Sequence, residues 1–257
     1  MRHNQLWFLA IIVTTFLLES HLSYASRTHS PKADSRISSI PPGTWALLVG
    51  VSEYPTNPKR SLLGPKNDIR LVSRFLQELQ VPGKQMMVLA DGISQEELPP
   101  ESTLGLPTHD AILAAFALLK RKAQSGELSQ VLIHMSGHGA QQPDTDGDES
   151  DGFDEIFLPR DIGSWNSDIQ AVANAIDDDT LSKSIDGIRE AGANVIAVFD
   201  NCHSGTMTRG APLPSDIVFR KVTPSDLGIP QQTNLTRKRF LPSSARPVAS
   251  KKGGYIA

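Results

Sequence analysis

The middle of the chain alternates between short apolar runs and longer segments in which apolar residues recur at helical spacing. The runs are too short for helices and rich in branched residues, so they predict buried strands at 45–51, 86–89, 130–136 and 195–199. Apolar residues spaced three or four apart predict helices over 67–79, 109–124 and 177–191. We expect Asn67 and Thr108 to cap the first two helices.

Strands that alternate with helices of this length predict a parallel sheet with helices on both faces. We expect residues 91–107 to form a loop and 155–159 a short extended piece. Beyond Thr206 the periodicity is lost among Pro, Ser, Thr and basic residues, which predicts a long flexible segment up to Lys252. The last five residues, 253–257, have the composition of another strand that has just begun.

The N-terminus has the pattern of a segment that directs export. Arg2 precedes a short apolar core at 6–18, and Ser23-Tyr24-Ala25 provides a small-x-small cleavage site. We therefore expect a signal peptide over 1–25, an exposed linker over 26–43, and export to the periplasm or the exterior. The alternative is an uncleaved membrane anchor formed by 6–18, although this run is shorter than the ~20 residues of a spanning helix.

Charge changes this picture only locally. The net charge of −3 over 257 residues implies no bulk attraction to nucleic acid or to an anionic membrane. The signs are segregated, however: 144–161 holds eight carboxylates, whereas 209–257 is rich in Lys and Arg.

Two strand ends carry reactive side chains. The strand at 195–199 leads into Cys202, the only cysteine of the chain, and the strand at 130–136 leads into His138. Because reactive groups sit past the carboxyl ends of strands in open α/β sheets, these two residues form a candidate nucleophile and base. The main-chain N–H groups of Gly139 and Cys202 are candidates for an oxyanion hole, since small residues let a substrate approach closely.

Residues 134–139 read His-Met-Ser-Gly-His-Gly, and 200–205 read Asp-Asn-Cys-His-Ser-Gly. In this order, the two motifs resemble the metacaspase branch of the caspase-like cysteine peptidases. The resemblance implies a caspase-like three-layer α/β/α sandwich with a mainly parallel sheet. It places the large catalytic portion at 44–208, followed at 209–257 by a flexible basic linker and the start of an incomplete small portion. It also implies that His138 is the general base and Cys202 the nucleophile.

The resemblance further implies protein or peptide substrates with Arg or Lys before the scissile bond. A pocket for such a side chain needs a buried or half-buried carboxylate, and Asp200, which ends an apolar strand, is suitably placed to line it. By the resemblance, Asp68 is the second acidic residue of the pocket and Ser136 supplies a hydroxyl. Taken alone, Asp68 has the pattern of a solvated carboxylate in the first turn of a helix.

Calcium is the cofactor to consider, and no organic cofactor is indicated. The acidic run resembles an EF-hand loop only in part, since Glu149 replaces the required glycine and no helix precedes it. The family resemblance instead suggests an activating Ca²⁺ held by Asp154, Asp177 and Asp178. Arg209 occupies a position where the family often has another carboxylate, and a solvated acidic loop is the alternative.

The sequence therefore predicts an exported cysteine endopeptidase that cleaves after Arg or Lys. Two alternatives stay open: a caspase-like peptidase of other specificity, for example for Asn, and a catalytically inactive caspase-like interaction domain. None of these three hypotheses involves a nucleic-acid partner. Association with a membrane is expected only if the N-terminal segment is uncleaved.

Overall fold

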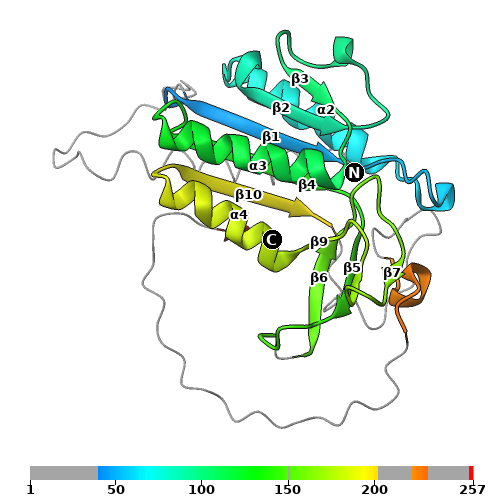
Figure 1. Cartoon of the computed structure of the whole chain (residues 1–257). Coiled ribbons are helices and arrows are strands. Elements are labelled where there is room, and N and C mark those ends of the chain that lie inside the picture. The colour runs from blue at the N-terminus through cyan, green and yellow to red at the C-terminus, as the bar shows by residue number, and fades with distance from the viewer. Residues whose placement is uncertain (1–39, 150, 202–221, 231–254, 257) are drawn as a thin grey trace, which may run out of the picture. The chain divides into compact units, whose positions relative to one another are not determined.

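A computed structural model of the chain describes residues 40–149, 151–201, 222–230 and 255–256. Its centre is a six-stranded sheet in which every adjacent pair of strands is parallel. The strand order is β11-β10-β4-β1-β2-β3, so the chain builds from the middle to one edge and then to the other (Figure 1). The strands are β1 (Thr44–Gly50), β2 (Met86–Ala90), β3 (Thr103–Gly105), β4 (Gln130–Ser136), β10 (Asn194–Asp200) and β11 (Tyr255–Ile256).

Helices cover both faces of this sheet. In Figure 1, α3 (His109–Gln124) and α4 (Asp178–Glu190) lie on one face, and α2 (Gly64–Glu78) lies on the other. Short 3₁₀ helices connect the larger elements: η2 (Pro58–Arg60), η3 (Gly83–Gln85), η4 (Gln95–Glu97) and η5 (Pro224–Leu227). This arrangement confirms the predicted three-layer α/β/α architecture with a mainly parallel sheet.

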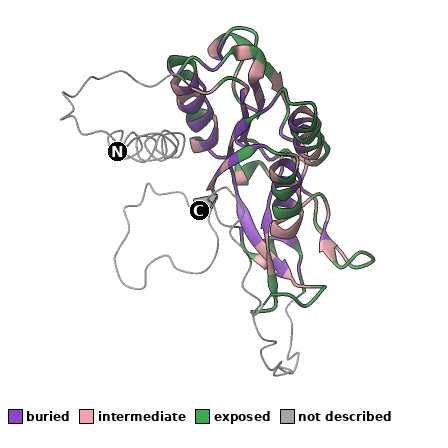
Figure 2. Cartoon of the chain, turned by 90° about the vertical axis from the view of Figure 1, so that its left-hand side faces the viewer, coloured by how far each residue is buried: buried purple, intermediate pink, exposed green. Residues whose placement is uncertain are grey.

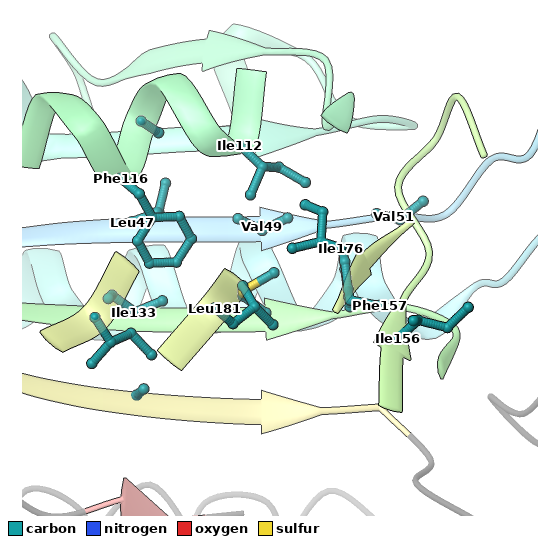
Figure 3. Packing of buried hydrophobic residues seen from close by; sticks show 14 of the residues in the cluster. Leu47, Val49, Val51, Ile112, Phe116, Ile133, Ile156, Phe157, Ile176 and Leu181 are labelled. Carbon is teal, nitrogen blue, oxygen red and sulfur yellow. The ribbon is translucent and has the colours of Figure 1, made fainter. Parts of the chain in front are cut away.

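The core lies mainly between the sheet and the helices α3 and α4. Leu47 and Val49 of β1 pack with Ile112 and Phe116 of α3 and with Leu181 of α4 (Figure 3). The strands are buried over most of their length, whereas the outward faces of the helices are exposed (Figure 2). Burial on both sheet faces explains why the strands read as continuous apolar runs rather than as alternating ones.

The start of α2 differs from the prediction. Asn67 does not cap this helix but lies inside it, because Pro65 in the first turn already fixes a helical backbone. The capping bond comes from elsewhere: the Ser52 hydroxyl accepts a hydrogen bond from the N–H of Lys66 at 3.0 Å. The cap predicted at Thr108 is confirmed, since its side chain accepts from Ala111 N at 3.4 Å.

Beyond the carboxyl end of β4 the chain leaves the main sheet and forms a second, antiparallel one. This smaller sheet consists of β5 (Gly139–Pro143), β6 (Phe153–Phe157) and β9 (Ile176–Asp177), and a hairpin of β7 (Trp165–Asn166) and β8 (Ala171–Val172) follows β6. The extended piece expected at 155–159 is thus β6, two residues earlier. The loop expected at 91–107 contains the short strand β3, whose three residues are too few to show a period.

Residues 222–230 correct the expectation of an unpacked segment after Thr206. Val222, Leu227 and Ile229 are buried in the main core cluster, and η5 lies among them. A strand at the end of the chain was expected, and Tyr255 and Ile256 form β11, which pairs with β10.

Several expectations fall on residues outside the described ranges, namely the signal peptide over 1–25, most of the linker, Cys202, Arg209 and the remainder of the basic segment. Within the described ranges, none of the helices has the length and hydrophobicity needed to cross a bilayer.

Candidate active site

The predicted base lies where the chain passes from the main sheet to the smaller one. His138 follows the end of β4 by two residues and is buried, with 4% of its surface exposed. Three main-chain bonds hold this turn: Val51 N–H donates to Ser136 O at 2.9 Å, Gly137 N–H to Asp200 O at 3.5 Å, and Leu158 N–H to His138 O at 3.1 Å. The main chain that carries the imidazole is therefore fixed by the residue after β1, by β10 and by the residue after β6.

The imidazole has a defined tautomer. Its Nε2 lies 2.8 Å from the main-chain oxygen of Arg60, the last residue of η2. A carbonyl oxygen can only accept a hydrogen bond, so Nε2 carries the proton and donates it. The basic lone pair of the neutral ring is then on Nδ1, which is the nitrogen able to take a proton from a thiol.

Tyr54 supports the same histidine, and sequence reasoning missed it. Its hydroxyl accepts a hydrogen bond from the N–H of His138 at 3.0 Å and donates to Leu158 O at 3.3 Å. Its ring centroid lies 5.1 Å from that of the imidazole, at an interplanar angle of 45°. The only hint in the sequence is a tyrosine in the polar loop directly after a buried strand, where a fully buried phenol needs a partner.

The loop that carries Tyr54 is in turn held by Asp91, just past the end of β2. Asp91 Oδ1 accepts hydrogen bonds from the N–H groups of Ser52 at 2.6 Å and Glu53 at 3.1 Å. Its Oδ2 lies 3.4 Å from Nε of Arg160, and the side chain is 2% exposed. Burial raises the pKa of Asp91 to about 6, against the lowering effect of the Ser52 hydrogen bond.

Glycines around His138 make room for the turn. A Cβ on Gly137 would lie 3.1 Å from two ring atoms of Phe157, so the Phe157 ring would have to shift to admit a side chain there. Gly139 opens β5, and its carbonyl oxygen accepts a hydrogen bond from Val222 N–H at 3.0 Å. The Gly139 N–H, our candidate oxyanion donor, therefore belongs to a peptide chain that is anchored on both sides.

The structure brings the three predicted pocket residues together. Ser136 Oγ donates a hydrogen bond to Oδ2 of Asp68 at 2.9 Å, and Asp68 is only 7% exposed. Asp200 is the register partner of Ser136 on the neighbouring strand, so the two side chains project from the same face of the sheet. Asp68 is thus a buried, hydrogen-bonded carboxylate rather than a solvated helix-start residue.

The predicted nucleophile follows this cluster closely in sequence. Cys202 itself lies outside the described residues, but β10, which leads to it, ends at Asp200 directly beside Ser136 on β4. The strand that leads to the cysteine and the strand that leads to His138 are therefore neighbours that end level with each other at the same edge of the sheet.

The acidic residues gather around β6 and the start of α4. Asp154 shares a group with Asp144 and Asp148 in which the potential ligand oxygens all lie within 4.8 Å of one another. Burial, and then the negative charges of Asp144, Asp178 and Asp177, raise the pKa of Asp154 to about 6, against the lowering effect of a hydrogen bond from Gln142.

The two helix-start carboxylates have a different environment. Asp177 caps α4 by accepting from Thr180 N at 2.6 Å, and burial raises the pKa of Asp178. The predicted trio of Asp154, Asp177 and Asp178 is thus close enough to interact electrostatically. The compact group around Asp154, however, is completed by Asp144 and Asp148 from the preceding loop.

The fold and this edge of the sheet define a caspase-like α/β domain with a fixed, buried histidine at the end of its central strand. A family model described as the metacaspase, peptidase C14 domain matches residues 45–210, and the chain belongs to this family.

Known relatives agree with this assignment. The chain is 35% identical over 162 residues to Metacaspase-1B of Aspergillus terreus, covering 63% of this chain and 38% of that protein. It is 35% identical over 161 residues to Metacaspase-1 of Pyricularia oryzae, covering 63% of this chain and 36% of that protein. It is 34% identical over 161 residues to Metacaspase-1 of Mycosarcoma maydis, covering 63% and 35% respectively. The chain therefore spans little more than a third of the length of these relatives.

Proposed function

We propose that this chain is a cysteine endopeptidase that hydrolyses peptide bonds after Arg or Lys, with Cys202 as nucleophile and His138 as base. The observation that carries the proposal is the contact between His138 Nε2 and the Arg60 carbonyl at 2.8 Å. This contact keeps the proton on Nε2 and the basic lone pair on Nδ1, at the strand end beside β10. Membership of the peptidase C14 family supports the same chemistry.

In the proposed mechanism, each proton has a defined donor and acceptor. Nδ1 of His138 takes the proton of the Cys202 thiol, and the thiolate attacks the scissile carbonyl. The N–H groups of Gly139 and Cys202 stabilise the oxyanion. When the carbon–nitrogen bond breaks, the imidazolium gives its proton to the leaving amine. Water, deprotonated by His138, then hydrolyses the thioester and regenerates the thiol.

The pocket residues support a basic side chain before the scissile bond. Asp68 and Asp200 supply carboxylates beside the reacting strand ends, and Ser136 holds Asp68 at 2.9 Å. A guanidinium or ammonium group can replace water as the partner of such carboxylates, whereas an acidic substrate side chain would be repelled.

We also propose that Ca²⁺ activates the enzyme by binding the acidic residues near β6. Clustered carboxylate oxygens suit Ca²⁺. Burial is the main cause of the raised pKa of Asp154, and the neighbouring carboxylates, whose charges a cation would neutralise, raise it further. Asp154, Asp177 and Asp178 would hold the ion, together with Asp144 or Asp148.

Export is the third part of the proposal. The signal-like segment at 1–25 supports delivery to the periplasm or the exterior, with anchoring through 6–18 as the alternative. Fractionation of expressing cells, with N-terminal sequencing of the mature chain, tests this. A mature chain that starts after Ala25 supports export, and a full-length chain in the cytosol contradicts it.

A panel of fluorogenic peptides tests the activity. Peptides ending in Arg, Lys, Asp or Asn are offered to the full chain with and without Ca²⁺, and Cys202→Ala serves as the blank. We expect hydrolysis of the Arg and Lys peptides only. Cleavage of the Asn peptide instead favours the alternative specificity, and no cleavage at all favours an inactive interaction domain.

A further inference from the structure

A short segment beyond the nucleophile strand packs against the turn that carries the predicted base. Val222 N–H donates to Gly139 O at 3.0 Å, one residue after His138. Leu227 is 1% exposed, and Val222, Leu227 and Ile229 all belong to the main core cluster. We refer to residues 222–229 as the docked segment.

The docked segment has a defined local structure. Thr223 and Asp226 form a capping box at the start of η5, and Gly228 ends it with a φ of 74°. A hydrogen bond from the Thr223 hydroxyl, a second from its N–H and the nearby charge of Arg60 all lower the pKa of Asp226. The segment is therefore a folded part of the domain with its own caps, although the sequence around it is polar and basic.

Arg60 contacts both the docked segment and the predicted base. Its guanidinium Nη2 donates to Asp226 O at 2.5 Å, while its own carbonyl oxygen accepts from Nε2 of His138 at 2.8 Å. Inside η2, Arg60 N–H donates to Asn57 O at 2.9 Å, so the main chain of Arg60 is held by a single short turn. A 3₁₀ turn of three residues is easily displaced, so a second attachment would limit its motion.

We propose that Arg60 is a positioning residue, which orients the imidazole of His138 through its carbonyl and is itself anchored by its side chain to the docked segment. This proposal rests on the proposed function of His138 as the general base. The docked segment then has a role in the reaction. Although it follows β10 in the sequence, it helps to hold His138, the proton acceptor, in place. Undocking the segment would release the Arg60 side chain and let the imidazole turn away from the tautomer and direction it needs.

Four variants of the full chain test the proposal. Arg60→Ala removes the anchor, and Arg60→Lys keeps a charged donor. Leu227→Ala removes a buried side chain of the docked segment and leaves Arg60 and His138 themselves unchanged. Lys59→Ala is the matched control, because it removes the same charge from an exposed neighbour in the same 3₁₀ turn.

We expect kcat on an Arg peptide to fall about tenfold or more in Arg60→Ala with little change in KM, because a displaced base slows chemistry rather than binding. Arg60→Lys should recover most of this loss, and Lys59→Ala should behave as wild type. The double variant Arg60→Ala/Leu227→Ala should lose no more than the worse single variant, since both break one connection. Equal kcat in Arg60→Ala and Lys59→Ala, or additive losses, would overturn the proposal.

Two readouts do not depend on peptidase activity. The ¹⁵N resonances of His138 should report the Nε2–H tautomer in wild type and a tautomer mixture in Arg60→Ala. The amide of Val222 should be protected from hydrogen exchange in wild type and exposed in Leu227→Ala, while amides of α3 stay protected. If wild type cleaves no peptide, the proposed function fails, and these two measurements alone decide on the positioning role. An unchanged tautomer in Arg60→Ala would then contradict it.

Discussion

The phenol of Tyr54 and the imidazole of His138 are joined twice, by a hydrogen bond of 3.0 Å from the histidine main chain to the tyrosine hydroxyl and by a ring contact of 5.1 Å. The hydroxyl also donates to Leu158 O, so it links the loop after β1, the turn after β4 and the residue after β6. A buried hydroxyl with two partners cannot be removed without leaving both of them unsatisfied.

Tyr54→Phe should therefore lower both stability and activity. Two buried main-chain groups lose a partner, and we expect the free energy of unfolding to fall by about 1–3 kcal/mol. Urea titration measures this loss, and kcat on an Arg peptide should fall as well. Thr56→Val is a matched control, since it removes a hydroxyl that donates to Ile162 O at 3.2 Å without contacting His138. Equal effects of both variants on kcat would contradict a role of Tyr54 at the base.

Asp68→Asn should weaken recognition of basic substrates. The buried carboxylate loses its charge but keeps an oxygen for the Ser136 hydroxyl, so folding should change little. Truncating one partner of a buried charge pair typically costs ~2–5 kcal/mol, so kcat/KM on Arg peptides should fall by roughly 30-fold or more. Asp110→Asn removes a charge from an exposed carboxylate and should have no such effect. Retained cleavage of Arg peptides by Asp68→Asn would remove this residue from the pocket.

Asp200→Ala tests the second pocket carboxylate. Asp200 lies beside Ser136 at the end of β10, and its main-chain oxygen still accepts from Gly137 N–H in the variant. We expect hydrolysis of Arg and Lys peptides to be lost while the Cys202 thiol still reacts with iodoacetamide. Undiminished cleavage would show that the basic side chain is bound elsewhere.

The pH dependence of stability should change in Asp91→Asn. Burial raises the pKa of Asp91 from 3.8 to about 6 in the folded chain, so the folded state binds this proton more tightly than the unfolded state. The stability that this proton contributes is complete below 3.8 and is lost as the pH rises through about 6. The full difference corresponds to roughly 3 kcal/mol, and it should be absent in the amide variant. Urea titrations between pH 4 and 7 measure how the free energy of unfolding depends on pH in wild type and in Asp91→Asn. The same pH dependence in both proteins would contradict a raised pKa of Asp91.

Calcium should stabilise the folded chain through the acidic residues around Asp154. An ion that binds only the folded state raises Tm with its concentration, so we expect a Tm increase with millimolar Ca²⁺ that is smaller in Asp154→Asn. Asp177→Asn is informative because Asn caps a helix as well as Asp does, so this variant removes charge without removing the cap of α4. An identical Tm with Ca²⁺ and with chelator in wild type would contradict the calcium proposal.

The sequence predicted the main sheet well because its central strands are buried on both faces. β4 has the predicted limits, and β1 and β10 agree to within a residue or two, since continuous apolar runs are unambiguous when bounded by polar residues. The short strands β3 and β5 were missed, and β6 was predicted two residues too late. Their residues are mixed in polarity, and their pairing depends on neighbours distant in sequence.

The candidate site was predicted unevenly for a physical reason. Motifs singled out His138 and the candidate pocket residues, because the proposed chemistry requires particular side chains. Arg60 was not predicted, since its proposed action on the histidine is through a carbonyl that every residue possesses. One feature of the sequence indicated a folded docked segment, namely the capping box from Thr223 to Asp226 followed by Leu227 and Gly228. It was overlooked because the neighbouring residues are polar and basic.

The order of strands in the main sheet has a consequence for biosynthesis. β1, β2, β3 and β4 are contiguous in sequence and can assemble as soon as they leave the ribosome, whereas β10 must add to the free side of β4 afterwards. The turn that carries the imidazole is thus translated before the thiol-bearing stretch, and it is completed only when β10 brings Asp200 O to the N–H of Gly137. On the proposed chemistry, a growing polypeptide is spared premature cutting of itself or of its neighbours until this late docking event.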